Sequence, residues 1–226
     1  MIESSFEVKL KYNQNNKMNQ YLLEFITIAG IHLLAVMSPG PDFAMIVKQA
    51  IVHSRRTALY TSFGLGLGIA VHVFYSLVGI GLIISQSIVI FNTIKWVGAL
   101  YLIYIGIMSL RSKAKDTIES VKSDHAVSIS TIQAIRTGFL TNAFNPKVTL
   151  FFLALFTQVI NPNTPVVIKA GYGLEMILAT MLWFSFVSIV LTNPIIKNKF
   201  LKVSHIVEKV TGGILIALGI KVLLEK

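Results

Sequence analysis

A short stretch near residue 40 combines helix-breaking residues with a charge inside an apolar segment. Residues 38–42 read SPGPD, so Pro39, Gly40 and Pro41 stand directly before Asp42. Each proline lacks an amide proton and its ring clashes with the preceding turn, while glycine relaxes the backbone further. Preceding carbonyls therefore lose helical partners and can accept hydrogen bonds from an ammonium group. The half-helix that follows begins with free amide protons and a positive dipole end, which suits a carboxylate.

A second break, at residues 145–147, repeats this arrangement. Asn145 and Pro146 interrupt another apolar segment, and Lys147 follows with a charge opposite to that of Asp42. Charges buried in a membrane are expected to be paired, so Asp42 and Lys147 either form an ion pair between two helices or contact a charged solute. A free amino acid carries both an ammonium and a carboxylate and would use both breaks. We therefore predict substrate binding at residues 39–42 and 145–147.

Three ionisable residues inside apolar stretches are candidates for carrying a proton, namely Glu175, Asp42 and His72. An ionisable group at membrane depth is a functional hypothesis by default, and Glu175 comes first because it lies well inside its stretch. The alternatives are a hydrogen-bonded interior glutamate and a packing histidine, and packing is the preferred interpretation of His72. Glu24 lies nearer the end of its stretch and is expected at the membrane interface.

The composition indicates a membrane protein. Of the 226 residues, 54% are hydrophobic and 13% are charged, whereas about a quarter are charged in soluble domains. The net charge of +10 does not form a basic, aromatic-rich surface, so membrane lipid and not nucleic acid is the predicted partner. The chain has no cysteine, five scattered histidines and neither an HExxH nor a GxSxG motif. The sequence therefore favours neither an enzyme nor a metal site, and it indicates no cofactor.

Six apolar stretches are long enough to cross a bilayer, which takes about 17–25 helical residues. They cover residues 22–51, 58–84, 94–110, 138–160, 166–191 and 206–224, with the two breaks in the first and fourth. The predicted fold is an all-α integral membrane protein with six transmembrane helices. Eight glycines are expected to permit close helix packing, and they are Gly64, Gly66, Gly68, Gly79, Gly81, Gly212, Gly213 and Gly219.

The basic residues predict the orientation of these helices. Most lie between stretches one and two, three and four, and five and six, and lysine and arginine are retained on the cytoplasmic side. Both termini are therefore expected to be periplasmic. The residues that carry this bias are Lys48, Arg55, Arg56, Arg111, Lys113, Lys115, Lys122, Arg136, Lys197, Lys199, Lys202 and Lys209.

The two halves of the chain resemble each other. Sliding the sequence along itself places Pro39 on Pro146 and Gly64 on Gly171, and a slightly longer shift places the third stretch on the sixth. Because three helices per copy is an odd number, the second copy must enter from the opposite side. Such inverted repeats are typical of secondary transporters with sites at broken helices near the midplane. We predict repeats at about 22–111 and 137–226, joined by a cytoplasmic linker at 112–136.

The first seventeen residues are polar and do not resemble a signal peptide. Met18 stands immediately before the first apolar stretch. We therefore expect a single transporter domain at 18–226, with residues 1–17 an upstream extension that is not part of the native protein.

Four stretches resemble the lysine exporter (LysE/RhtB) family of bacterial amino-acid efflux proteins. They are MSPGPDFAMIV (37–47), SRRTALYTSFGLGLGIAVHVFYSLVGIG (54–81), KWVGALYLIYIGIMSLRS (95–112) and GFLTNAFNPKVTLFFLALFTQ (138–158). The resemblance covers most of the chain from Met18 onward and is strongest at PGPD and NPK, while the fifth stretch matches only in general character. Family members often have a glycine before the paired arginines, where this chain has Ser54. The resemblance implies export of amino acids or close derivatives through the bacterial inner membrane, driven by protons.

We therefore predict a secondary transporter that exports amino acids by alternating access at the two breaks. The alternative is an uncoupled channel or facilitator for small polar solutes, which would show the same helices but no dependence on a proton gradient. A homo-oligomer is compatible with the sequence, which does not indicate the substrate amino acid.

Overall fold

The computed structural model describes residues 2–38, 40–111, 129–190 and 194–224, and almost all of them are helical. The first half contains α1 (Ile2–Met37), α2 (Pro41–Lys48), a π-helical turn (Gln49–His53), α3 (Arg55–Gln86) and α4 (Ile88–Arg111). The second half contains α6 (Thr131–Ala143), α7 (Pro146–Gln158), α8 (Val166–Val190) and α9 (Pro194–Leu224). No strand occurs in these ranges, so the prediction of an all-α chain is confirmed.

Four helices are long and apolar enough to cross a membrane. Their candidate spans are Gln14–Met37, Arg55–Gly79, Asn92–Arg111 and Val166–Val190, and the pair α6 and α7, bent by 56°, would make a fifth. The sixth expected stretch lies in α9, which is not among these candidates from the described residues. The structure therefore supports four or five spans, and the count of six remains a prediction.

The start of the fourth stretch differs from the prediction. This stretch was expected to begin at residue 138, but α6 already begins at Thr131, inside the predicted linker. The Ser130 hydroxyl oxygen accepts a hydrogen bond from the Gln133 amide at 3.2 Å, which is the usual way a serine starts a helix. The predicted break in the first stretch is confirmed, because α1 ends at Met37 and α2 begins at Pro41.

Glycines bring two pairs of helices into close contact. α3 packs most extensively against α6, and α4 against α9. At the first interface, a Cβ atom added to Gly64 or Gly138 would overlap the backbone of the opposite helix. At the second, a Cβ on Gly106 would lie 2.6 Å from the carbonyl oxygen of Gly212. Small residues therefore allow these backbones to approach, as expected for membrane helices.

The packing role predicted for the other glycines holds only in part. A Cβ would meet a facing helix at Gly66, Gly68, Gly212 and Gly219 as well, but added atoms at Gly79 and Gly213 meet nothing within 4 Å among the described residues. The prediction is therefore wrong at Gly79 and Gly213. Gly81 lies outside the residues whose surroundings are described.

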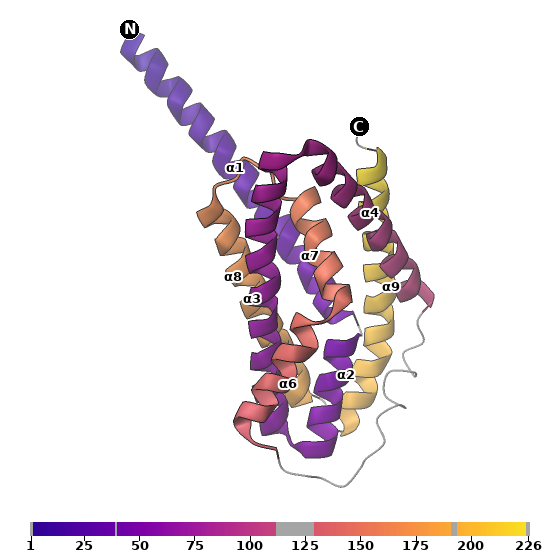
Figure 1. The fold of residues 1–226 in the computed structure, drawn as a ribbon. Helices are drawn as coiled ribbons and strands as arrows, with labels where there is room; N and C mark the ends of the chain where they lie inside the picture. Colours follow the sequence, from indigo (N-terminus) through magenta and orange to yellow (C-terminus); the bar gives the residue numbers. More distant parts are fainter. Residues whose placement is uncertain (1, 39, 112–128, 191–193, 225–226) are drawn as a thin grey trace.

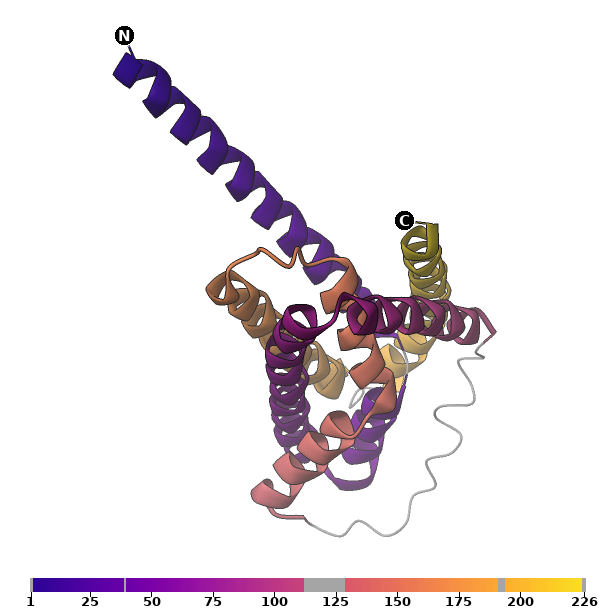
Figure 2. The same cartoon turned by 45° about the horizontal axis from the view of Figure 1, so that its top comes forward.

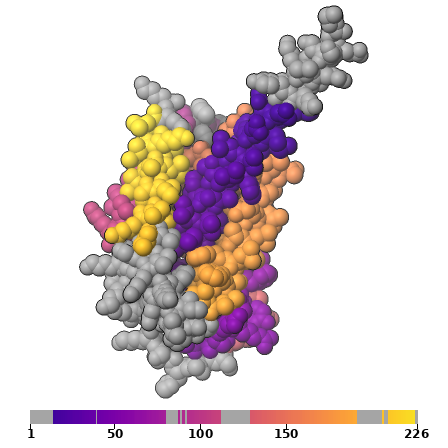
Figure 3. Space-filling model, turned by 180° about the vertical axis from the view of Figure 1, so that it is seen from behind, coloured from indigo at the N-terminus to yellow at the C-terminus, as the bar shows by residue number. Residues whose placement is uncertain are grey.

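The helices form a single bundle from which the beginning of α1 projects (Figures 1 and 2). The start of α1 and the end of α9 lie at the same end of this bundle, while α2 and α6 occupy the opposite half (Figure 1). Seen from behind, α1 lies between α8 and α9 (Figure 3). Large apolar side chains on the outside of the bundle remain exposed, including Leu23, Phe74 and Leu182. Such a surface suits lipid as the surrounding solvent.

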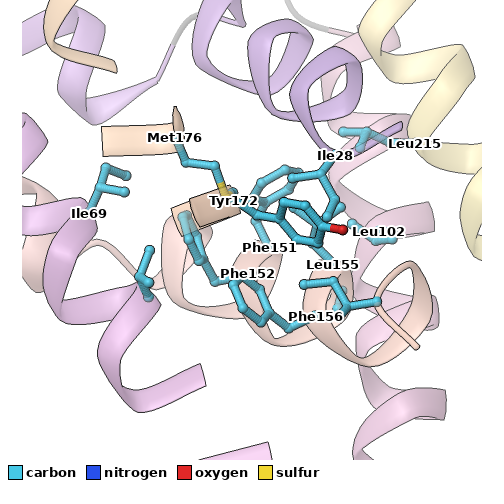
Figure 4. Packing of buried hydrophobic residues seen from close by; sticks show 13 residues of the cluster. Ile28, Ile69, Leu102, Phe151, Phe152, Leu155, Phe156, Tyr172, Met176 and Leu215 are labelled. Atoms are coloured by element: carbon cyan, nitrogen blue, oxygen red, sulfur yellow. The ribbon is translucent and has the colours of Figure 1, made fainter. Parts of the chain in front are cut away.

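α7 supplies the centre of the hydrophobic core. Its buried Phe151, Phe152, Leu155 and Phe156 contact apolar side chains from α1, α3, α4, α8 and α9 (Figure 4). α7 therefore lies at the meeting point of both halves of the chain, and the break at its N-terminus lies close to the middle of the bundle (Figure 1).

Candidate functional site

The first break lies between α1 and α2. The Ser38 amide donates to the carbonyls of Leu34 and Ala35 at 3.1 and 3.3 Å, which closes the last turn of α1. Gly40 is extended and precedes α2, which begins with Pro41 at its first turn. Proline suits this position because the first amides of a helix have no intrahelical partner. Pro39, predicted to open the backbone here, lies outside the described residues.

The second break lies between α6 and α7 and has a defined cap. The Asn145 side-chain oxygen accepts a hydrogen bond from the Lys147 amide at 3.0 Å, and Pro146 occupies the first turn of α7. Both predicted breaks therefore exist, and each starts a new helix at a proline. The positive dipole end of α7 therefore begins at the second break, where Asn145 caps the Lys147 amide.

Side chains from the second break hold the carboxylate of the first. Asp42 is buried, and its Oδ2 accepts a hydrogen bond from the Asn142 amide nitrogen at 2.7 Å. Its Oδ1 accepts another from the Asn145 amide nitrogen at 3.1 Å. The two breaks, which are about a hundred residues apart in sequence, therefore form one polar centre.

Asn142 was not predicted as a site residue. It lies three residues before Asn145, so the two amides emerge on the same side of the chain where α6 ends. It is fully buried, and its Oδ1 has no hydrogen-bond partner among the described residues. The spacing N-x-x-N before a proline could have indicated it, but asparagine in a helix usually has a local role.

The Lys147 side chain reaches back from the second break to the first. Its ammonium donates to the Ser38 hydroxyl at 3.5 Å, and a Cβ on Gly40 would lie 3.4 Å from it. The Asp42 side chain therefore contacts the second half of the chain, and the Lys147 side chain contacts the first half. Direct pairing of the two charges remains a prediction.

These groups line a cavity of about 60 Å³ in the middle of the bundle, with room for roughly four to six water-sized groups. The polar wall consists of both breaks and includes Ser38, Asp42, Asn145 and Lys147. The remaining wall is mostly apolar and comes from α1, α3, α4, α7, α8 and α9. A mostly apolar cavity with a few convergent polar groups is the usual form of a small-molecule site.

Two of the proton-carrier candidates, His72 and Glu175, do not line this cavity. His72 is fully buried. Its Nε2 lies 2.9 Å from the Asn142 carbonyl oxygen and its Nδ1 lies 2.7 Å from the Tyr75 hydroxyl. His72 therefore contacts the backbone of the residue that holds Asp42. Glu175, on α8, is partly exposed, and its Oε2 is buried without a hydrogen-bond partner in the described part of the chain.

Glu24 is buried within the bundle, and its expected depth at the membrane interface stays a prediction. It is 7% exposed, and the Thr164 hydroxyl donates to both carboxylate oxygens at 3.1 and 2.9 Å. The Asn161 amide and the Tyr172 hydroxyl also donate to it, each at 3.3 Å. Glu24 thus links α1 to the connection between α7 and α8 through hydrogen bonds, and it does not line the cavity.

Comparison with known proteins places most of the chain in one family. The family described as LysE type translocator matches residues 33–226. The threonine efflux protein of Escherichia coli (strain K12) is 27% identical over 205 residues, which cover 91% of this chain and all of the relative. Uncharacterized membrane protein YrhP of Bacillus subtilis (strain 168) is 29% identical over 209 residues, covering 88% of this chain and 97% of the relative. No solved structure matches at a significant level.

Proposed function

The chain belongs to the LysE type translocator family, and from this premise we propose that it exports amino acids or close derivatives from the cytoplasm. Relatives that match 91% of this chain over their full length are named threonine efflux proteins, which makes threonine the first substrate to test. The apolar outer surface and the candidate spans suit a multi-pass protein of the bacterial inner membrane.

The observation that supports this proposal is that side chains from both helix breaks line one cavity. Asp42 offers a carboxylate to a substrate ammonium, and Lys147 offers an ammonium to a substrate carboxylate. The positive dipole end at the start of α7 also favours a carboxylate there. A zwitterion satisfies both ends of this centre at once, whereas a simple cation or anion satisfies only one.

The arrangement of the helices supports transport by alternating access between inverted repeats. α3 packs against α8 and α4 against α9, and these are the helices that the repeat sets in corresponding positions. In the proposal, the two halves rock about the crossed breaks and expose the cavity to each side in turn. The start of α1 and the end of α9 face the periplasm in this proposal, because Lys48 of α2 and Arg136 of α6 belong to the opposite half of the bundle (Figure 1).

The proposal is tested by transport in proteoliposomes that contain the purified protein. With radiolabelled threonine inside and out at equal concentration, an imposed pH gradient should drive net accumulation on one side. Empty liposomes and an imposed gradient collapsed by a protonophore are the controls. Downhill flux that ignores the gradient would support the alternative of an uncoupled facilitator. Absence of movement for threonine and for a broad panel of amino acids would overturn the export proposal.

Glu175→Gln should abolish accumulation driven by the pH gradient and spare downhill exchange of threonine. The reason is that Glu175 is an ionisable group at membrane depth with an oxygen that lacks a partner among the described residues, whereas the cavity itself lies elsewhere. The measurement compares gradient-driven uptake with exchange in the same liposomes. Glu24→Gln, the same change at a buried carboxylate outside the cavity, should retain both. If gradient-driven uptake persists in Glu175→Gln, Glu175 does not carry the proton, and Asp42 and His72 become the candidates.

A further inference from the structure

A polar pair interrupts the apolar wall of the cavity away from the helix breaks. His32 on α1 and Thr180 on α8 both line the cavity, and each is 1% exposed. The His32 Nε2 lies 3.4 Å from the Thr180 hydroxyl oxygen. The imidazole otherwise lies against aromatic rings, with centroid distances of 6.3 Å to Phe151 and 6.2 Å to Phe152.

The hydrogen bonding of His32 is incomplete. Its Nδ1 is buried and has no hydrogen-bond partner within the described residues. A neutral imidazole has one N–H and one lone pair, so in either tautomer Nδ1 keeps a capacity that nothing satisfies. Leaving a buried polar group without a hydrogen bond destabilises the folded protein by about 1–3 kcal/mol. Such groups are rare in native structures and often have a functional reason. A ligand that enters the cavity and bonds to the imidazole would supply one.

A purely structural role explains His32 less well. The contact of His32 with Thr180, at 3.4 Å, is longer than the usual range for a hydrogen bond of about 2.7–3.2 Å. His72 shows what a satisfied histidine looks like in this bundle, with partners on both ring nitrogens at 2.7 and 2.9 Å. An apolar side chain would pack among the phenylalanines at lower cost than the imidazole does.

The position of His32 relates it to the charged centre. It stands six residues before Ser38, which directly follows α1, a separation of about 9 Å along the axis. A zwitterionic head held at Asp42 and Lys147 would leave a short side chain free to extend toward the imidazole. Asp42, Lys147 and His32 all line this one cavity.

We propose that His32 and Thr180 form a subsite that recognises a hydroxyl on the side chain of the transported amino acid by hydrogen bonding. This proposal rests on the export function proposed above and adds specificity-determining residues to it. A hydroxyl both donates and accepts, so it can complete the hydrogen bonding of Nδ1 in either tautomer. Sites built to bond a substrate hydroxyl reject analogues without it much more strongly than apolar pockets reject an extra methyl group.

Threonine and valine provide the test, because they differ by a hydroxyl in place of a methyl group. Transport of each radiolabelled amino acid is measured in proteoliposomes containing the wild type, His32→Leu, His32→Gln or Thr180→Val. We expect the wild type to prefer threonine, and His32→Leu to lower the threonine-to-valine ratio at least tenfold through slower threonine transport. Thr180→Val should lower it less, and His32→Gln, which keeps a donor and an acceptor, should retain part of the preference.

Thr211→Val is the matched control for these variants. Thr211 is a buried threonine of α9 whose hydroxyl donates to the Leu34 carbonyl at 3.1 Å, and it does not line the cavity. The threonine-to-valine transport ratio of Thr211→Val should equal that of the wild type. A ratio unchanged in His32→Leu, or in both Thr180→Val and His32→Gln if His32→Leu does not fold, would overturn the subsite while leaving the export function intact. A wild type that moves neither amino acid, nor any other in the panel, would overturn both proposals.

Discussion

Replacing Asp42 with asparagine should lower threonine transport in proteoliposomes by at least about 100-fold. The variant keeps the shape of the side chain and removes only its charge. Removing one partner of a buried, hydrogen-bonded charge pair costs about 3–5 kcal/mol, and each 1.4 kcal/mol corresponds to about a tenfold change. The measurement is counterflow of radiolabelled threonine, which requires binding and reorientation but no proton gradient.

The fold should tolerate this change. The new amide at position 42 brings a donor to a place where the Asn142 and Asn145 side chains now donate. The Oδ1 atom of Asn142 has no partner among the described residues, so rotation of that amide by half a turn presents an acceptor instead. Elution as a single species in detergent, as for the wild type, would therefore show that the lost transport reflects lost charge.

Glu24→Gln is the control for Asp42→Asn, because it makes the same chemical change at another buried carboxylate of the first half. Glu24 binds hydroxyl and amide donors at the connection between α7 and α8, and it does not line the cavity. Its transport should stay close to that of the wild type. Equal loss in the two variants, or full transport in Asp42→Asn, would contradict the role of Asp42 in binding the substrate ammonium.

Replacing Gly64 with alanine should destabilise the protein by about 3 kcal/mol or more and remove most of the folded material. Overpacking a well-packed protein interior typically costs about 1–3 kcal/mol. Here a Cβ would overlap the Ile135 carbonyl and lie 2.9 Å from the Phe139 backbone nitrogen, and a helix backbone cannot move aside locally. The measurement is the monodisperse fraction and the unfolding temperature of the detergent-solubilised protein.

Gly79→Ala provides the same substitution in the same helix without the clash. A Cβ at Gly79 meets nothing within 4 Å in the described part of the chain, and alanine favours a helix over glycine by up to about 1 kcal/mol. Gly79→Ala should therefore unfold at the wild-type temperature or above it. Similar behaviour of the two variants would show that α3 and α6 do not approach as closely as the structure has them.

The local consequences of residue chemistry could be predicted from the sequence. Proline cannot continue a helix, so the interruptions before Pro41 and Pro146 follow from the covalent structure of the residue wherever the chain lies. Abundant apolar residues and few charges likewise determine a membrane environment without reference to the fold. The PGPD and NPK motifs carried the resemblance to the family, and the family is confirmed by the match over residues 33–226.

Contacts between distant segments were decided only by the tertiary structure. The sequence could not show that Asn142 and Asn145 donate to the Asp42 oxygens, and an ion pair of Asp42 with Lys147 remains a prediction. The incomplete bonding of His32 and the buried contacts of Glu24 were also invisible in the sequence. In a water-soluble helix the apolar face indicates what is buried, but in a membrane helix the face toward lipid is apolar as well. The sequence alone therefore determined the environment of the chain, its two breaks and its family, and packing decided which polar side chains meet at the centre.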